Sequence, residues 1–343
     1  MESRKFFSCA CFYVRNIFLK QLNCHVEYWD RSQFIRSYSQ FLYKNGYKEE
    51  EQIDSLISEI EAEIDRRKNR EYESIKRQEL ISQIYKPLYP QLTQLQESFL
   101  SPEFLAIVNY CKQEDATFEG LFDFIQETQV PRTYSFPVFT AEFCEMFLAE
   151  MHNFNQSDAP KERPNSMNRY GVLVHELGFQ PFFTSLRENY FNPISQILFP
   201  DWGGGTLDSH KVFTVQYEPS KDPDLSFHFD NAEVTVNVAL SPKESYKGGN
   251  LYFGAMRTEV DKESDRTQYI HEPTIGVIHR GQHKHGASPV TDGQRCNLII
   301  WMRSSAIRNQ KCPMCDQEPQ LQKSLGFGDG FTRAETVDVC SVI

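Results

Sequence analysis

His228-Phe229-Asp230, followed by Val234-Thr235-Val236-Asn237-Val238-Ala239-Leu240, is the stretch on which the fold depends. Because the side chains of a strand point alternately to its two faces, a His-x-Asp pair places two ligating groups on one face. The run after it has polar groups at alternate positions, as expected of a strand that lines a cavity. Alone, such a pair is more often two solvated polar residues at a strand end. The strand that follows favours a metal site.

A second histidine would complete such a site, and the candidates are His279, His283 and His285. Strict alternation places His283 and His285 on the same strand face, so geometry alone does not separate them. Two imidazoles and one carboxylate leave three positions of the metal open, which is typical of non-haem Fe(II) oxygenases. The sequence therefore predicts an iron site with His228 and Asp230 among its ligands.

Arg295 opens the run Arg295-Cys296-Asn297-Leu298-Ile299-Ile300-Trp301, which we expect to form a strand. An arginine that points into a closed barrel is costly unless a fixed anion meets it. Its planar guanidinium suits a carboxylate held by two parallel hydrogen bonds. The alternative is an internal ion pair with an Asp or a Glu.

With these motifs, residues 137–304 resemble the catalytic domain of the 2-oxoglutarate- and Fe(II)-dependent prolyl and lysyl hydroxylases, and procollagen lysyl hydroxylases in particular. Those enzymes also follow His-x-Asp with a Thr-x-Asn-x-Ala-Leu strand. Their distal histidine lies in a His-x-His pair, ten positions before an arginine. The resemblance implies an α+β protein built on a double-stranded β-helix, a jelly-roll barrel of two facing sheets flanked by helices. It also implies the site: Fe(II) on His228, Asp230 and His285, with the distal carboxylate of 2-oxoglutarate on Arg295.

The same resemblance implies hydroxylation of an unidentified substrate, with a lysine or proline side chain of a protein as the expectation, and release of succinate and CO2. O2 would be the second co-substrate and L-ascorbate the reductant that restores Fe(II). Tyr217, at the end of the expected strand 210–217, and Asn237 are candidates to help hold 2-oxoglutarate. For Tyr217, a place in the hydrophobic core is an equally good interpretation.

Two other functions fit the same residues. A metal-binding interaction module of this fold would keep the ligands without turnover and would use the N-terminal region to recruit partners. A cupin-like hydrolase or isomerase would use a metal-bound water and would need no inward arginine. Release of succinate separates the module from an oxygenase, and insensitivity to 2-oxoglutarate analogues would favour the hydrolase or isomerase.

The totals exclude some classes of function. The 343 residues carry a formal net charge of -11, with a pI of about 5.4, which disfavours a nucleic-acid-binding protein because phosphate contacts need a basic face. The sequence contains no stretch of about 18 or more apolar residues, so no membrane-spanning helix is predicted. Arg15 and Asn16 interrupt the apolar run near the N-terminus, so we expect no signal peptide. Nine scattered cysteines indicate a reducing compartment, and therefore an intracellular location, cytoplasmic or nuclear.

Three regions are expected along the chain: a mostly helical accessory region at 1–130, a dioxygenase domain at 131–304 with its core at 208–304, and a tail at 305–343. In the first region, apolar residues at helical spacing predict an amphipathic helix: Ile53, Leu56, Ile57, Ile60 and Ile64. A basic cluster lies on or beside this helix, and we expect it on a solvated face rather than against phosphate: Arg66, Arg67, Lys68 and Arg70.

Further along, Thr140 is placed to cap a helix that begins the second region. The loop from Asn155 to Asn168 could border the mouth of the active site, although an ordinary polar connection is as good an interpretation. The charged insert from Met256 to Gln268 is a candidate lid or partner-binding loop, with a solvated loop as the alternative.

The tail contains Cys312-Pro313-Met314-Cys315, which has the spacing of metal ligands. No second Cys-x-x-Cys follows, so a zinc ion would need a further ligand such as Cys340 or a histidine. Near the N-terminus, Cys9 and Cys11 could join Cys24 and His25 in another metal site. For those residues, small buried thiols are the commoner interpretation.

Overall fold

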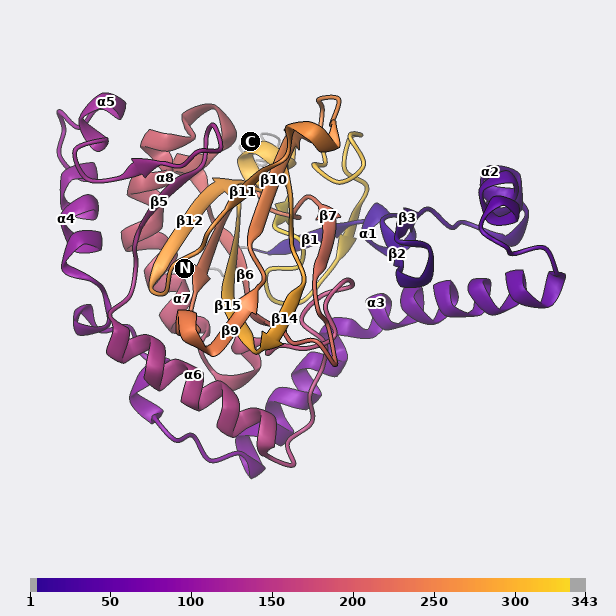
Figure 1. The fold of residues 1–343 in the computed structure, drawn as a ribbon, viewed down its shortest axis with the longest axis horizontal. Helices are drawn as coiled ribbons and strands as arrows, with labels where there is room; N and C mark the ends of the chain where they lie inside the picture. The colour runs from indigo at the N-terminus through magenta and orange to yellow at the C-terminus, as the bar shows by residue number, and fades with distance from the viewer. Residues whose placement is uncertain (1–4, 334–343) are drawn as a thin grey trace, which may run out of the picture.

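Two antiparallel β-sheets form the centre of the computed structural model, which describes residues 5–333 (Figure 1). The larger sheet has the strand order β4-β5-β12-β8-β15-β6, and the smaller sheet has the order β11-β10-β13-β7. The strands are β4 Gln126–Glu127, β5 Tyr134–Pro137, β6 Ser209–Tyr217, β7 Leu225–His228, β8 Val234–Ala239, β10 Leu251–Met256, β11 Thr267–Tyr269, β12 Ile275–Arg280, β13 His283–Ala287 and β15 Arg295–Arg303. A further short pair joins β9 (Tyr246–Gly248) to β14 (Val290–Gly293).

From β6 to β15 the chain passes back and forth between the two sheets, because β6, β8, β12 and β15 lie in the larger sheet and β7, β10 and β13 in the smaller. One apolar cluster combines side chains of both sheets, which therefore face each other: Phe213 and Val215 of β6, Leu251 and Phe253 of β10, Val277 of β12 and Ala287 of β13. The expected α+β class, with antiparallel sheets and helices, is confirmed. Among the described residues, no strand pairing joins the larger sheet to the smaller one, so the two central sheets do not close into one barrel.

Helices cover the outer face of the larger sheet (Figure 1). Phe143 of α6 and Phe182 of α7 stack with ring centroids 5.6 Å apart, in one cluster with Val236 of β8 and Ile300 of β15. The predicted cap is confirmed, because the Thr140 hydroxyl accepts a hydrogen bond from the backbone N–H of Phe143 at 3.2 Å. The helices of this part are α4 Pro102–Cys111, α5 Phe118–Leu121, α6 Ala141–Gln156, α7 Gln180–Leu186, α8 Asn192–Leu198 and α9 Ser305–Arg308.

Near the N-terminus, α2 (Arg31–Lys44) and the first part of α3 (Glu50–Ile84) extend away from the sheets (Figure 1). The predicted amphipathic helix is confirmed, since its apolar side chains are buried in α3: Leu56, Ile57, Ile60 and Ile64. They pack against a short β-hairpin of β2 (Ile17–Leu19) and β3 (Cys24–Val26). The two helices and this β-hairpin thus share a small core of their own.

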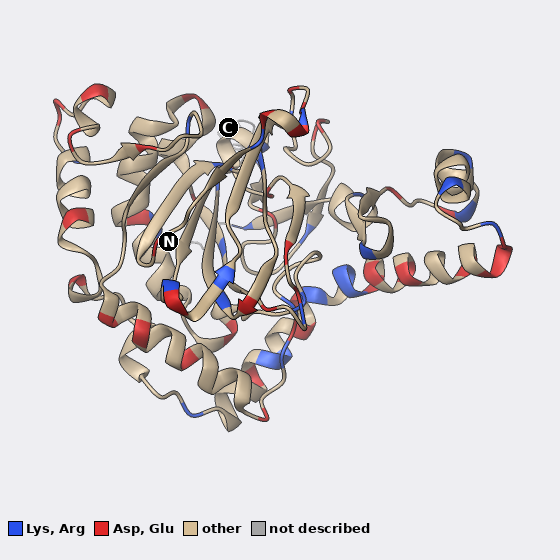
Figure 2. Ribbon diagram, in the orientation of Figure 1, with Lys and Arg blue, Asp and Glu red and all other residues tan. Residues whose placement is uncertain are grey.

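The sequence predicted a solvated face for the basic cluster of α3, and this holds for the exposed Lys68, whereas Arg66 and Arg70 are half-buried and Arg67 is buried. Arg67 is only 5% exposed, and its guanidinium donates to the backbone carbonyls of Phe12, Arg15 and Asn16. It also binds the carboxylate of Glu63 at 2.8 Å. Figure 2 shows Lys and Arg positions gathered where α3 reaches the body of the molecule. Because acceptors meet the buried charge, this face of the helix can pack inward.

The two ends of the described chain meet in a third sheet. Its central strand, β1 (Phe6–Cys9), is antiparallel to both neighbours, β16 (Leu321–Lys323) and β17 (Phe331–Thr332). A single turn, α1 (Cys11–Val14), follows β1. Cys340, named above as a further ligand for zinc, lies outside the described residues. The bounds of the three regions stay a prediction.

Within residues 5–333, none of the helices combines the length and the apolar character that a membrane crossing needs.

Candidate active site

Three of the predicted residues lie together between the two sheets. His228 ends β7, Asp230 follows two residues later, and His285 on β13 is the direct cross-strand partner of His228. The Nε2 atom of His228 is 3.4 Å from one carboxylate oxygen of Asp230, and that of His285 is 3.7 Å from the other. Potential ligand atoms of all three residues lie within 4.8 Å of one another. This is the donor set of a two-histidine, one-carboxylate metal site.

Hydrogen bonds fix the orientation of both imidazoles. The Nδ1 of His228 is 2.8 Å from the carbonyl of Ser226, and that of His285 is 2.9 Å from the carbonyl of His283. Because a carbonyl can only accept, each Nδ1 carries a proton, and Nε2 is the nitrogen left to bind a metal. Both Nε2 atoms face Asp230, which fits the residues to a divalent cation.

The carboxylate of Asp230 is held equally firmly. Its Oδ2 accepts from the Thr235 hydroxyl at 2.7 Å, and its backbone binds Gly281 and the side chain of Gln282. Burial alone would raise the pKa of this carboxyl, but the nearby imidazoles of His285 and His228 hold its pKa below the usual range. Burial lowers the pKa of His285 to about 3. The cluster therefore presents one carboxylate anion and, at His285, a neutral nitrogen donor.

The other two candidate histidines have different partners. Nε2 of His283 is 2.9 Å from the carbonyl of Gly254, which can only accept. The rings of His283 and His285 both lie beside that of Phe253, with centroids 5.3 and 5.5 Å away, so the two histidines share a face of β13 as strict alternation predicts. His279, on β12, places its Nδ1 2.9 Å from the carbonyl of Arg280. Of the three candidates, the structure places His285 beside Asp230.

Arg295 is buried, and no acidic side chain among the described residues forms an ion pair with it. Its side chain is 1% exposed, and none of its three guanidinium nitrogens has a hydrogen-bond partner. Burial lowers the pKa of this guanidinium, an effect that the phenols of Tyr217 and Tyr246 oppose. The alternative interpretation was an internal ion pair with an Asp or a Glu. Within residues 5–333, no carboxylate forms such an ion pair with Arg295. A buried cation of this kind fits a ligand carboxylate.

Tyr217 and Asn237 lie in the same region. Tyr217 is the cross-strand partner of Arg295, with the guanidinium 5.6 Å from its ring, and its hydroxyl accepts from Asn168 at 3.3 Å. The Asn237 side-chain oxygen accepts from Asn297 at 2.6 Å. Asn297 lies two residues after Arg295 on β15, and therefore on the same face of the strand.

Two further residues, Asn168 and His271, belong to this hydrogen-bond network, and the sequence did not indicate a role for them in the site. Nδ2 of Asn297 is also 3.2 Å from Nδ1 of His271, which precedes β12. Neither Asn168 nor His271 stands in a motif with the ligands, and only the folded chain brings them close. Asn168 ends the loop from Asn155 that the sequence placed as a candidate border of the active-site mouth.

One cavity, of about 1230 Å³, joins these groups. All six predicted site residues line it: Tyr217, His228, Asp230, Asn237, His285 and Arg295. Its walls also include Asn165 and Asn168 of the predicted border loop, Arg70 of α3 and Phe327 of the tail. The N-terminal helix and the C-terminal tail therefore help to shape the site.

The chain is similar to a family profile and to several known proteins. A family profile described as the OGFOD2-like domain matches residues 81–204. The chain is 47% identical to the "2-oxoglutarate and iron-dependent oxygenase domain-containing protein 2" of Xenopus tropicalis, over 98% of this chain and 97% of that protein. The Homo sapiens protein of the same name is 44% identical over 99% of this chain and 98% of that protein. The "Multifunctional procollagen lysine hydroxylase and glycosyltransferase LH3" of Rattus norvegicus is 28% identical over 57% of this chain and 26% of that protein.

Proposed function

The chain belongs to the family of 2-oxoglutarate and iron-dependent oxygenase domain-containing protein 2, which makes it a dioxygenase, and on that premise we propose that it hydroxylates a side chain of a protein substrate. The proposed iron ligands are His228, Asp230 and His285, and the proposed anchor of 2-oxoglutarate is Arg295. The observation that carries these roles is the buried guanidinium of Arg295, which has no ion-pair partner among the described residues and shares a cavity with the His-Asp-His cluster.

The chain's own residues would bind the metal and the co-substrate and hold them in a fixed orientation. His228 and His285 would bind the metal through Nε2, because backbone carbonyls hold the Nδ1 protons. Asp230 offers a carboxylate oriented by Thr235. When bound, Fe(II) and 2-oxoglutarate supply the O2-dependent oxidation of an unactivated C–H bond, with succinate and CO2 as by-products. L-Ascorbate is the proposed reductant that keeps the iron in the Fe(II) state.

Arg295 would bind the distal carboxylate of 2-oxoglutarate by two parallel hydrogen bonds. Tyr217 supports this position, since its hydroxyl accepts from Asn168 and keeps its own proton free to donate. Asn237 would act through its hydrogen bond with Asn297. Together these residues form a polar pocket at the end of β6 and β15.

We also propose that the two facing sheets are the halves of a double-stranded β-helix. The alternation of successive strands between the sheets, and the orders β6-β15-β8-β12 and β7-β13-β10-β11, support this description.

A protein substrate is supported by the lysine hydroxylase named among the relatives, and a lysine or a proline is the side chain to examine first. The cavity, at about 1230 Å³, has room for more than the co-substrate. An intracellular location, cytoplasmic or nuclear, stays a proposal.

The test is release of succinate from 2-oxoglutarate with Fe(II) and ascorbate, over a panel of lysine- and proline-containing peptides. We expect turnover by the wild-type chain and none by Asp230→Ala. Binding is followed separately with Mn(II) in place of iron: 2-oxoglutarate should raise the melting temperature of the wild type but not of Arg295→Met. Metal binding without succinate across the whole panel would favour an interaction module. Turnover that ignores 2-oxoglutarate analogues would favour a metal-dependent hydrolase.

A further inference from the structure

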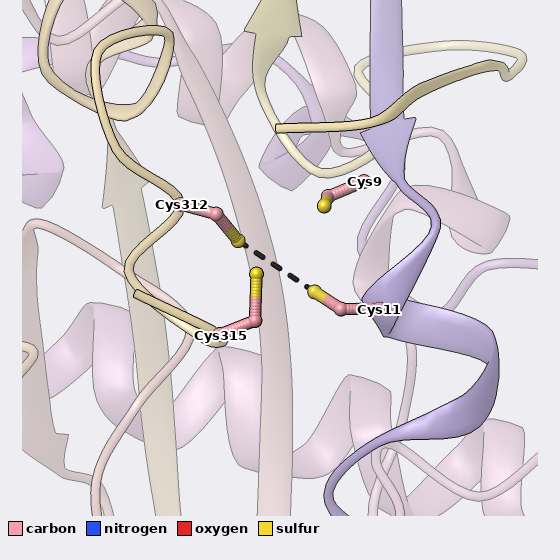
Figure 3. Close-up of side chains that lie close together, drawn as sticks. All are labelled: Cys9, Cys11, Cys312 and Cys315. Carbon is pink, nitrogen blue, oxygen red and sulfur yellow. Dashed lines mark hydrogen bonds between the residues drawn. The ribbon is translucent and has the colours of Figure 1, made fainter. Parts of the chain in front are cut away.

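Four cysteines form a cluster on the side of the fold where the two ends of the described chain meet (Figure 3). The sulfur atoms of Cys9, Cys11, Cys312 and Cys315 all lie within 4.8 Å of one another, and those of Cys11 and Cys312 are 3.6 Å apart. Three of the four side chains are buried, and that of Cys315 is partly exposed. All four point toward a common centre in Figure 3.

The backbone holds each pair in place. Cys9 ends β1 and Cys11 begins α1, while the N–H of Ala10 between them donates to the carbonyl of Gln320 at 2.8 Å. The pairing of β1 with β16 and β17 therefore fixes the first pair against the tail.

The second pair lies on a tight turn. The backbone N–H of Asp316 donates to the carbonyl of Cys312 at 2.9 Å, and the N–H of Cys312 donates to the carbonyl of Gln317 at 2.8 Å. Asp316 adopts φ 59, a left-handed conformation that a residue other than glycine rarely adopts without a reason. The turn brings Cys312 and Cys315 to one side.

The geometry suits a metal better than a disulfide. All eight cysteines within the described residues are free. Zinc binds thiolate sulfur at about 2.3 Å, which places the sulfurs of a tetrahedral site roughly 3.8 Å apart. A cluster of small buried thiols is the alternative, and Phe7, Phe331 and Met314 do pack around it.

A divalent cation would let all four sulfurs bind as thiolates, with their protons released to solvent.

We propose that Cys9, Cys11, Cys312 and Cys315 bind a structural zinc ion that fastens the N-terminal strand to the C-terminal tail. Four protein ligands leave no open position, so the site is structural and not catalytic. The sequence pointed to each half separately, with Cys24, His25 or Cys340 as partners. The fold instead joins the two halves to each other.

The turn that carries Cys312 and Cys315 is connected to the proposed iron site through the side chain of Arg257. The guanidinium of Arg257, in the charged insert, donates to the carbonyl of Met314 at 3.0 Å and binds Asp316 at 2.9 Å. The same guanidinium lies 4.6 Å from the ring of Phe229, which stands between His228 and Asp230. Loss of zinc would therefore disturb the insert and the segment that carries two proposed iron ligands.

The test is the zinc content of the full chain, measured by mass spectrometry of the metal after dialysis against a weak chelator. We expect one zinc ion per chain in the wild type and in Cys24→Ser, whose thiol lies outside the cluster. The double variant His228→Ala/Asp230→Ala should keep its zinc, which separates this site from the iron site. Cys11→Ser and Cys312→Ser should lose it, and Cys312→His should retain it because an imidazole can replace the thiolate.

Cobalt substitution of the wild-type chain gives a readout that does not depend on the folding of variants. Co(II) bound to thiolates should give intense sulfur-to-metal charge-transfer absorption in the near ultraviolet, which a His-Asp-His site cannot give. The proposal is overturned if the wild-type chain shows neither zinc nor this absorption. It is equally overturned if the four cysteines are isolated as disulfides, or if Cys312→Ser keeps its zinc while the His228→Ala/Asp230→Ala variant loses it.

Discussion

His228 and His285 are directly opposite each other on β7 and β13, with ring centroids 4.5 Å apart. Their approach depends on how two strands pair, because the residues are far apart in the chain. A slip of this pairing by one residue would turn one imidazole to the opposite face of the sheet. The register of β7 and β13 therefore determines whether the cluster with Asp230 exists.

The first prediction concerns the second histidine of the site. His285→Ala should abolish iron-dependent turnover of 2-oxoglutarate and weaken iron binding by more than about 100-fold, since Nε2 of His285 faces Asp230. His283→Ala should leave measurable turnover, because the His283 imidazole contacts the carbonyl of Gly254 instead. Succinate release and iron titration of both variants check this. Activity that survives in His285→Ala and disappears in His283→Ala would assign the ligand to His283.

Local motifs made much of this site predictable from the sequence. His228 and Asp230 are two residues apart, and the strand period alone places them on one face. Arg295 was identifiable because a buried guanidinium needs an anion. The choice between His283 and His285 was not local, since both lie on one face of β13 and only the pairing with β7 places His285 opposite His228.

Long-range contacts explain what the sequence could not provide. Cys11 and Cys312 lie 301 residues apart, and they meet only because β1 pairs with strands of the tail. Likewise, the burial of Arg67 depends on the carbonyls of a separate N-terminal turn. Helical spacing predicted the buried residues of α3, but nothing in that spacing indicates which other segment would cover a charged side chain.

The second prediction concerns Tyr217. Burial raises the pKa of this phenol to about 12, so it stays protonated at neutral pH and remains a donor. Tyr217→Phe removes a hydroxyl beside Arg295, and the loss of about 1 kcal/mol of hydrogen bonding should raise the KM for 2-oxoglutarate roughly fivefold with little change in kcat. Steady-state kinetics check this, with Tyr110→Phe on the distant α4 as the control. An unchanged KM would place Tyr217 in the core alone.

The third prediction concerns the start of α6. The Thr140 hydroxyl accepts the backbone N–H of Phe143, so Thr140→Ala should lower the free energy of unfolding by about 1 kcal/mol. Thr140→Ser keeps the acceptor and should retain most of the stability. Urea unfolding of the three proteins measures the difference. Equal losses for alanine and serine would show that the methyl group, rather than the cap, contributes the stability.

The last prediction concerns Glu63 on α3, which bridges three arginines. Its carboxylate is 2.8 Å from Arg66 and from Arg67, and it also binds Arg163 of the border loop. Burial opposes ionisation, but the hydrogen bond and charge of Arg66, with the charges of Arg67 and Arg163, lower the pKa of Glu63 from 4.5 to about 2.

A carboxyl whose pKa is lower in the folded state than in the unfolded state stabilises the fold above the unfolded value, and this contribution is lost as the pH falls. Glu63→Gln should therefore reduce the free energy of unfolding at pH 7 by on the order of 2 kcal/mol. The difference from wild type should shrink below pH 4.5 and vanish toward pH 2, the window set by the two pKa values. Urea unfolding at pH 7 and pH 4 measures it, with the exposed Glu114→Gln as the control. A difference that stays constant between these pH values would mean that Glu63 acts through packing, because only an ionised carboxylate can lose its contribution by protonation.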